Sequence, residues 1–467
     1  MSDIDWSSFD TPFGPRTGGV IPALLEKLDS PDARVRARAL KDIHFRAVAV
    51  NGGYGRPFLD VALALVPILA ARLDAPGELA PQLGQVLGVL GDIAAGNHRL
   101  HVARGLPLAG LTRTDIGPMR ATQAAVAALA APICERLSDA DAGVRAGAAF
   151  ALAWIPGEAA MSIPALVARL AMERHAATRA SLLLALGYVG APVDALLGAV
   201  GDKAPVGICA ALGVMLANPQ RMDDVLDAAL APLPKPVVAG LPFLDGALAR
   251  VRTQILGGAT TRRGDLAAHL ALVERLPPEV RPEAESWTVA VAAAGAAAPP
   301  HLLDPADLSD EACAVLRQRA GLLRGGRAPG LYQAFGRAGL FSGIDGNERA
   351  LGLDPQGPLD ERVEGRPLWW WLYEVRAGRV APSRFQALLA GRDALAVLED
   401  AATSPYKLYE DPARPGVFQF DAFADLLGGM ASALGVTSTL LDERLAKLRE
   451  YATKVVPSHQ PSFAPWP

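Results

Sequence analysis

The chain has 467 residues, enough for two or three ordinary domains or for one long array of repeats. Its composition is 51% hydrophobic but only 6% aromatic, so the apolar residues are mostly Ala and Leu, which favour helices; the predicted fold class is all-α. The net charge of −4 lacks the basic excess of proteins that hold nucleic acid along their length, which argues against nucleic acid as a partner.

Cysteine usage and apolar run lengths indicate the compartment. The three cysteines are far apart and fit neither a disulfide framework nor a metal-ligand spacing, which predicts a reducing cytoplasm and no metal or cofactor. The N-terminus has no signal pattern, and the longest apolar runs, 61–71 and 289–298, are shorter than the ~20 residues that span a bilayer. We therefore expect a cytoplasmic protein without a membrane partner.

A plan of two helices joined by a turn follows an N-terminal segment over residues 1–19. Residues 21–40 hold an apolar segment, a turn and a second apolar segment. Pro22 suits the first turn of a helix, where the missing N–H costs nothing. Asp32 suits the start of the second helix, where its carboxylate can accept from free N–H groups and meets the positive end of the helix dipole.

The same plan recurs twice further along the chain. A shift of 109 positions superposes like residues: Leu28 on Leu137, Asp32 on Asp141, Val35 on Val144 and Arg36 on Arg145. Pro132 stands near the start of this second copy. A third copy over residues 163–190 opens with Pro164, but Thr178 stands where the arginine is expected and Arg179 follows one position later. Several matches in register indicate repeats.

Glycines recur inside the second helix of these units. A glycine inside a helix costs about 1 kcal/mol relative to alanine. Their recurrence therefore predicts that the backbones of neighbouring helices approach closely. The glycines are Gly88, Gly91, Gly187, Gly190 and Gly213.

Two turn-rich stretches, residues 50–57 and 96–118, follow second helices and should emerge from the same edge of the array. They carry arginine and tyrosine side chains, types favoured at interfaces because they join a large contact area to a polar end. We expect this edge to contact an acidic partner, against the alternative of two solvated loops. The candidate binding residues are Tyr54, Arg56, Arg99, Arg104 and Arg113.

Two histidines lie in the second of these stretches. His98 and His101 have a spacing that could place both imidazoles on one helix face, near Asp92. The simpler interpretation, and the favoured one, is two polar residues of an exposed loop. We therefore keep the two histidines as binding candidates and predict no metal.

The last third of the chain has a different composition. Four prolines interrupt the pattern between residues 231 and 242, and Pro299-Pro300 closes an Ala-rich helix. We expect a repeat array over 20–300, a C-terminal helical domain or cap over 301–455 that ends in a helix over 440–451, and a flexible tail over 456–467.

The run Trp369-Trp370-Trp371 is the most distinctive feature of that C-terminal part. On a helix three successive indoles fan across about 200°, so at least one should meet another element, a partner or a ligand. Packing of the C-terminal domain against the last repeats is the structural explanation, and partner docking is the functional one. All three tryptophans are binding candidates.

The residues that mark the three copies resemble HEAT repeats, specifically the short bacterial kind that also occurs in phycobilisome-lyase-type proteins. They are Pro22, Asp32, Arg36, Pro132, Asp141, Arg145 and Pro164. The resemblance covers residues 20–220 best. It implies an α-solenoid of stacked antiparallel helix pairs in which the aspartates and arginines hydrogen-bond between adjacent repeats.

HEAT arrays are general interaction scaffolds. The sequence contains no nucleophile elbow, Walker loop, dinucleotide-binding glycine pattern or HExxH motif. We therefore expect a non-enzymatic scaffold that binds a protein partner through its concave face and edge loops. The alternatives are a bilin-lyase-like or other small-ligand protein with an apolar slot, a DNA-glycosylase-like protein with a basic groove, and a regulator that acts within an operon.

Overall fold

The computed structural model describes residues 4–9, 18–47, 59–96, 117–233, 237–276, 281–294, 304–324, 335, 351, 357–403 and 419–454. Helices dominate these residues, which confirms the all-α fold class. The chain divides into two compact units, residues 1–263 and 264–466. The boundary expected at Pro299-Pro300 lies outside the described residues, so that division of the chain stays a prediction.

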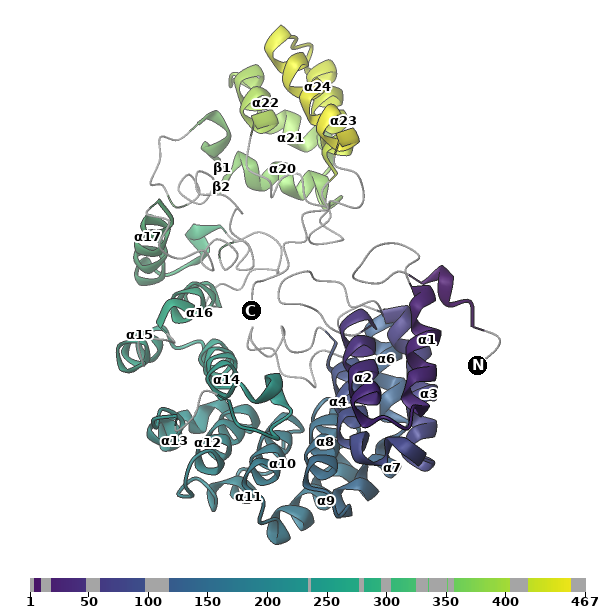
Figure 1. Ribbon diagram of the computed structural model, residues 1–467. Coiled ribbons are helices and arrows are strands. Elements are labelled where there is room, and N and C mark those ends of the chain that lie inside the picture. The colour runs from purple at the N-terminus through teal and green to yellow at the C-terminus, as the bar shows by residue number, and fades with distance from the viewer. Residues whose placement is uncertain are drawn as a thin grey trace. The chain divides into compact units, whose positions relative to one another are not determined.

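Helices make up most of the described part of the first unit (Figure 1). Its described helices are η1 (Trp6–Ser8), η2 (Gly18–Val20), α1 (Ile21–Glu26), η3 (Lys27–Asp29), α2 (Ala33–Ala47), α3 (Leu59–Asp74), η4 (Gly77–Gln82), α4 (Leu83–Ala95), α6 (Gly117–Ala127), α7 (Ala130–Glu135), η6 (Arg136–Ser138), α8 (Ala142–Ala153), η7 (Pro156–Glu158), α9 (Ala159–Met172), α10 (Ala176–Tyr188), α11 (Asp194–Leu197), α12 (Val206–Ala217), η8 (Pro219–Arg221), α13 (Met222–Ala229), η9 (Phe243–Gly246) and α14 (Leu248–Arg263). Helices α4, α8, α10, α12 and α14 contact one another in that order, and α7, α9 and α11 each contact the helix that follows in this series.

Three central helices of this series are buried on nearly every side. Residues 144–153 of α8 and 206–216 of α12 are all buried, and α10 buries every residue from 177 to 188 except Arg179. Such helices are apolar around their whole circumference, as expected for helices inside a protein. These three helices therefore present no free inner face of the kind expected for recognition.

Arg36 and Arg145 make the same contacts in the first and second copies. Arg36 Nη1 donates to the carbonyl of Ser30 at 2.7 Å, and Arg145 Nη1 donates to the carbonyl of Asp139 at 2.9 Å, six residues upstream in both cases. Both arginines are buried. The shift seen in the sequence therefore corresponds to equivalent geometry.

Each of these arginines also reaches the turn in front of another long helix. Arg36 Nε donates to Gln82 Oε1 at 3.0 Å, directly before α4. Arg145 donates to the two carboxylate oxygens of Glu173 at 2.7 and 3.0 Å, shortly before α10. The arginines thus connect successive helices of the series.

Arg179 belongs to the same set, so its apparent offset in the sequence was wrong. It follows His175, the N-cap of α10, by four positions, as Arg145 follows the N-cap Asp141. Arg179 Nη1 donates to the carbonyl of Glu173 at 3.5 Å, and Nη2 donates to Asp202 at 3.0 Å, shortly before α12. The turn of the third copy is one residue longer than the turn of the second copy. An alignment that starts from Leu170 therefore expects the arginine one position before its true place.

The aspartates begin their helices as predicted. Asp141 Oδ1 accepts from the Val144 N–H at 2.9 Å, and Asp32 Oδ1 accepts from the Arg34 N–H at 2.8 Å. Both bonds are local to the start of a helix. The resemblance implies bonds between copies for both the aspartates and the arginines. Among these residues, it is the arginines that make such bonds.

Two of the three repeat prolines occupy the first turn of a helix. Pro22 is the second residue of α1, and Pro132 is the third residue of α7. The prediction is wrong for Pro164, which lies inside α9 because that helix starts earlier, at Ala159. A proline there forfeits the bond to the carbonyl of Ala160.

Close helix approach is confirmed at three predicted glycines. A Cβ atom on Gly187 would lie 2.6 Å from Gly213 Cα, and one on Gly213 would lie 2.6 Å from the carbonyl oxygen of Leu183. At Gly91 it would lie 2.5 Å from the Phe150 ring. The prediction of close approach is wrong for Gly88 and Gly190, where a Cβ atom would meet no described neighbouring atom within 4 Å. Gly190 follows the end of α10 in a left-handed conformation with φ 74°.

An equivalent glycine contact joins α4 and α8. A Cβ atom on Gly147 would lie 2.5 Å from the carbonyl oxygen of Gly84, and one on Gly84 would lie 2.6 Å from that of Gly143. The α4–α8 and α10–α12 pairs therefore both approach at backbone distance.

The second unit contains shorter helices and one small hairpin. Its described elements are α15 (Leu266–Arg275), α16 (Arg281–Ala294), η10 (Pro305–Asp307), α17 (Asp310–Arg324), η11 (Pro358–Asp360), β1 (Arg362–Val363), β2 (Arg366–Pro367), α20 (Leu368–Arg376), α21 (Pro382–Leu388), α22 (Ala394–Thr403), α23 (Phe420–Leu434) and α24 (Thr439–Lys454). Strands β1 and β2 are antiparallel and turn through Glu364 and Gly365, which have φ of 52° and 80°. The last of these helices, α24, includes the predicted segment 440–451.

Among the described residues, no single helix is both long and apolar enough to cross a membrane. The segments Ala142–Ala153 and Pro156–Met172 reach the required length and composition only as a pair, and that pair is bent by 98°.

Candidate functional site

The predicted edge loops lie outside the described residues. This holds for Tyr54, Arg56, His98, Arg99, His101, Arg104 and Arg113. The hypothesis of a basic, aromatic edge therefore stays a prediction. Asp92, which was considered beside the two histidines, has a described partner: His44 Nε2 lies 2.7 Å from Asp92 Oδ2 and connects α2 to α4.

The three tryptophans of α20 belong to an apolar core of the second unit that is built from residues 359–448. Trp369 is buried in an apolar core with Phe385 and Phe423, and Trp370 and Trp371 pack against the same core. Trp371 Nε1 donates to the carbonyl of Val363 at 3.0 Å, in strand β1. As predicted for at least one of the three indoles, Trp371 therefore contacts another element, the hairpin that directly precedes the helix.

The hairpin also contributes a cation to one of these rings. The guanidinium carbon of Arg366 lies 5.2 Å from the centre of a Trp370 ring, within the range of a cation–π interaction. Arg366 and Arg362 both pair with Asp304, whose side chain is fully buried, at 3.0 and 2.8 Å. These contacts give the tryptophans and the hairpin a structural role.

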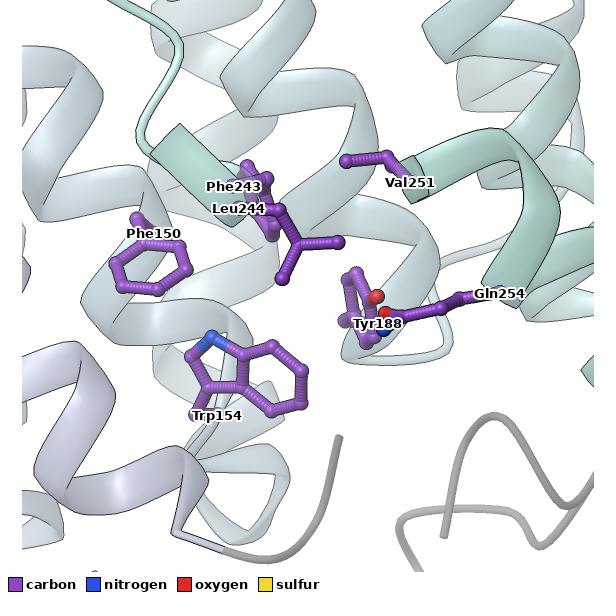
Figure 2. A pocket seen from close by; sticks show the side chains of 7 residues that line it. All are labelled: Phe150, Trp154, Tyr188, Phe243, Leu244, Val251 and Gln254. Carbon is purple, nitrogen blue, oxygen red and sulfur yellow. The ribbon is translucent and has the colours of Figure 1, made fainter. Parts of the chain in front are cut away.

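The candidate functional site is an aromatic depression in the first unit (Figure 2). It opens among the C-terminal ends of α8 and α10, the short helix η9 and the first turns of α14. The space inside it is about 210 Å³ and is open to solvent. Seven side chains line it: Phe150, Trp154, Tyr188, Phe243, Leu244, Val251 and Gln254.

Four aromatic rings hold one another in place in this depression. The ring centres of Phe150 and Phe243 are 4.9 Å apart at 89°, and those of Tyr188 and Phe243 are 5.6 Å apart at 9°. Trp154 lies 4.6 Å from Tyr188. Edge-to-face and stacked pairs at these distances are favourable beyond their buried area, so the four rings stabilise one another's positions.

The segment before α14 carries Phe243 and Leu244 into the depression. The Val238 N–H donates to the carbonyl of Gly246 at 2.8 Å, which closes a loop around η9. Gly246 has φ 79°, and a Cβ atom there would collide with the Val238 carbonyl, so the position requires glycine.

Two residues of η9 have left-handed backbone conformations that side chains disfavour. Leu244 has φ 47° and Asp245 has φ 53°. Aspartate tolerates this region, but leucine there costs of order 1–2 kcal/mol. The strained leucine is the one that lines the depression, and backbone strain of this kind clusters at functional sites.

Among the described residues, no charged side chain lines the depression. Its polar groups are the Trp154 indole N–H, the Tyr188 hydroxyl and the Gln254 amide. Burial lowers the pKa of the nearby Arg262, while Tyr188 acts in the opposite direction. Arg262 donates to the carbonyls of Met215 and Leu216 at 3.0 Å each. The depression therefore suits an uncharged, mainly apolar group.

Sequence reasoning did not find this site. Its residues come from four segments between 150 and 254, so no local spacing joins them. The available signal was the proline-rich interruption over 231–242, which directly precedes η9. Within the described part of the chain, no three His, Cys, Asp or Glu side chains are grouped in a way that could hold a metal ion.

Neither a scan against models of protein families nor a search of curated proteins finds a match to this chain.

Proposed function

We propose that the chain is a HEAT-like, non-enzymatic scaffold and that its aromatic depression holds one apolar side chain of a protein partner. The observation that carries this proposal is the depression itself, whose lining in the described part of the chain has four aromatic rings and no charged group. Anchor residues of protein interfaces typically fill pockets of this kind.

Repeated contacts support the HEAT-like architecture. Arg36, Arg145 and Arg179 each donate to the carbonyl six residues upstream and to a side chain in front of another long helix. Glycine contacts bring α4 to α8 and α10 to α12. A stack of helix pairs that bury each other's apolar sides gives the rigidity a scaffold needs.

The size of the depression favours a side chain over a small-molecule ligand. Pockets for drug-sized ligands and cofactors usually enclose about 300–1,000 Å³. The depression and the open solvent above it together amount to only about 210 Å³, so the hollow itself is shallow. It suits the tip of one apolar side chain better than an extended pigment.

The burial of the central helices determines where a partner can bind. Since α8, α10 and α12 are covered, the proposal places recognition at the ends of α8 and α10 rather than along a concave face. The strained Leu244 is half-buried at this position, so part of its side chain is available to a partner.

The test uses two neighbouring substitutions that have the same backbone effect. Cross-linking and affinity purification from the native cell would identify the partner, and calorimetric titration would measure its binding. Leu244→Gly removes a lining side chain and suits φ 47°, whereas Asp245→Gly relieves φ 53° and leaves the lining intact. We expect Leu244→Gly to weaken binding about tenfold, as for a typical anchor contact, and Asp245→Gly to leave it unchanged. Equal binding by both variants and the wild type would show that the depression is not the anchor.

A further inference from the structure

One face of α2 carries three cations and an aromatic ring in a narrow stripe. At 100° per residue, Arg34, Arg38, Lys41 and Phe45 fall within an arc of about 60°. All four side chains are exposed; Arg38 is 80% and Phe45 39% accessible. We call these four residues the α2 stripe.

The opposite side of α2 fixes the stripe in position. Leu40 and Ile43 are buried there, and Arg36 is held by the carbonyls of Ser30 and Pro31. The backbone under the stripe is therefore anchored, and little backbone conformational entropy is lost when a ligand binds.

The positive charge of the stripe is only partly compensated. Asp42 pairs with Arg38 at 3.6 Å, one turn along the helix. The ion pairs of the described residues include none with Arg34 or Lys41. The three cations outnumber the two acids beside them, Asp42 and Asp32 at the start of α2, which leaves a local excess of positive charge on a protein whose net charge is −4.

We propose that the α2 stripe binds an acidic peptide segment that carries one apolar residue. With a rise of 1.5 Å per residue, Arg38 follows Arg34 by about 6 Å and Lys41 follows by a further ~4.5 Å. Alternate side chains of an extended peptide recur on one face about every 6.6 Å, so carboxylates two residues apart can meet successive cations. The exposed part of the Phe45 ring, about 6 Å beyond Lys41, adds apolar surface at the end of the stripe.

Phosphates of a nucleic acid could meet the same cations, but Asp42 beside the stripe and the acidic balance of the whole chain favour the peptide. Because the cations are exposed, binding depends on salt and weakens as ionic strength rises. The inference does not depend on the aromatic depression, since it rests on other residues.

The experiment uses a fluorescein-labelled, end-blocked peptide of about a dozen residues that alternates Glu and Ser and has one Phe near its end. Fluorescence anisotropy with the full chain at about 50 mM salt should show saturable binding that weakens at about 200 mM salt. A matched peptide with Gln in place of Glu should bind at least about tenfold more weakly. A single-stranded oligonucleotide of equal length is the third probe.

The matched variants separate the stripe from overall charge. The triple variant Arg34→Gln, Arg38→Gln and Lys41→Gln should weaken binding of the acidic peptide about tenfold, since each exposed charge contributes modestly. A control with Arg174→Gln, Lys203→Gln and Lys447→Gln changes net charge equally at other exposed positions and should bind like the wild type. The proposal is overturned by absence of peptide binding at about 1 mM, by equal loss in both variants, or by tighter binding of the oligonucleotide.

Discussion

At the scale of single residues, the Glu173 carboxylate lies at the centre of a cluster of hydrogen bonds in the first unit. Its carboxylate accepts hydrogen bonds from Arg145, Arg169 and the N–H groups of Arg174 and His175. Burial by itself raises the pKa of this carboxyl, but the bonds from Arg145, the His175 N–H and Arg169 outweigh burial and lower the pKa to about 2. The carboxylate thus remains charged although its side chain is only 1% exposed.

Replacing this carboxylate should destabilise the first unit. Glu173→Gln leaves the Arg145 charge, whose side chain is 9% exposed, without its counter-ion, and breaking such a pair costs about 3–5 kcal/mol. Urea unfolding at pH 7, followed by circular dichroism, measures the loss of free energy of unfolding. The exposed Glu135→Gln is the control and should behave like the wild type.

The same pair predicts how stability depends on pH. Because the pKa of folded Glu173 lies below its usual value of 4.5, its contribution is complete above about pH 4.5 and is lost as the pH falls toward 2. Between pH 5 and 2.5, the free energy of unfolding should therefore fall more steeply with decreasing pH in the wild type than in Glu173→Gln. Identical pH dependence of the two proteins would contradict the role assigned to this carboxylate.

At the scale of helices, the glycine contacts explain how α10 and α12 pack at backbone distance. Gly213→Ala should destabilise the first unit by about 1–3 kcal/mol, because its Cβ atom must displace the backbone of α10. Gly88→Ala is the matched control in α4, where nothing lies within 4 Å of the new atom. There we expect a gain of up to about 1 kcal/mol from helix propensity. Thermal unfolding of the two variants checks the difference, and a similar loss in both would argue against close approach.

The sequence was sufficient for features that depend on local pattern. It predicted the helical class, the aspartates at helix starts and the close approach at Gly91, Gly187 and Gly213. It misplaced Pro164, because α9 begins five residues earlier, at Ala159, and it misplaced the register of Arg179, because one extra residue in a turn changes no periodicity. The hairpin at 362–367 was not expected, since two-residue strands leave almost no alternating pattern.

At the scale of the whole molecule, tertiary packing explains which features could not be predicted from the sequence. The repeat pattern predicted a concave face that binds a partner, yet α8, α10 and α12 are covered on all sides. The aromatic depression joins segments about a hundred residues apart, and contacts of that range leave no local signal. Recognition is therefore proposed at two limited surfaces, the depression and the α2 stripe.

The most direct test of the account is hydrogen–deuterium exchange of the full chain with and without its purified protein partner. A partner side chain seated in the aromatic depression should slow exchange in residues 150–154, 184–189 and 241–254, while α9 (159–172), which does not line the depression, stays unchanged. Protection confined to other segments, with unchanged exchange around Leu244, would contradict the claim that this depression holds the partner.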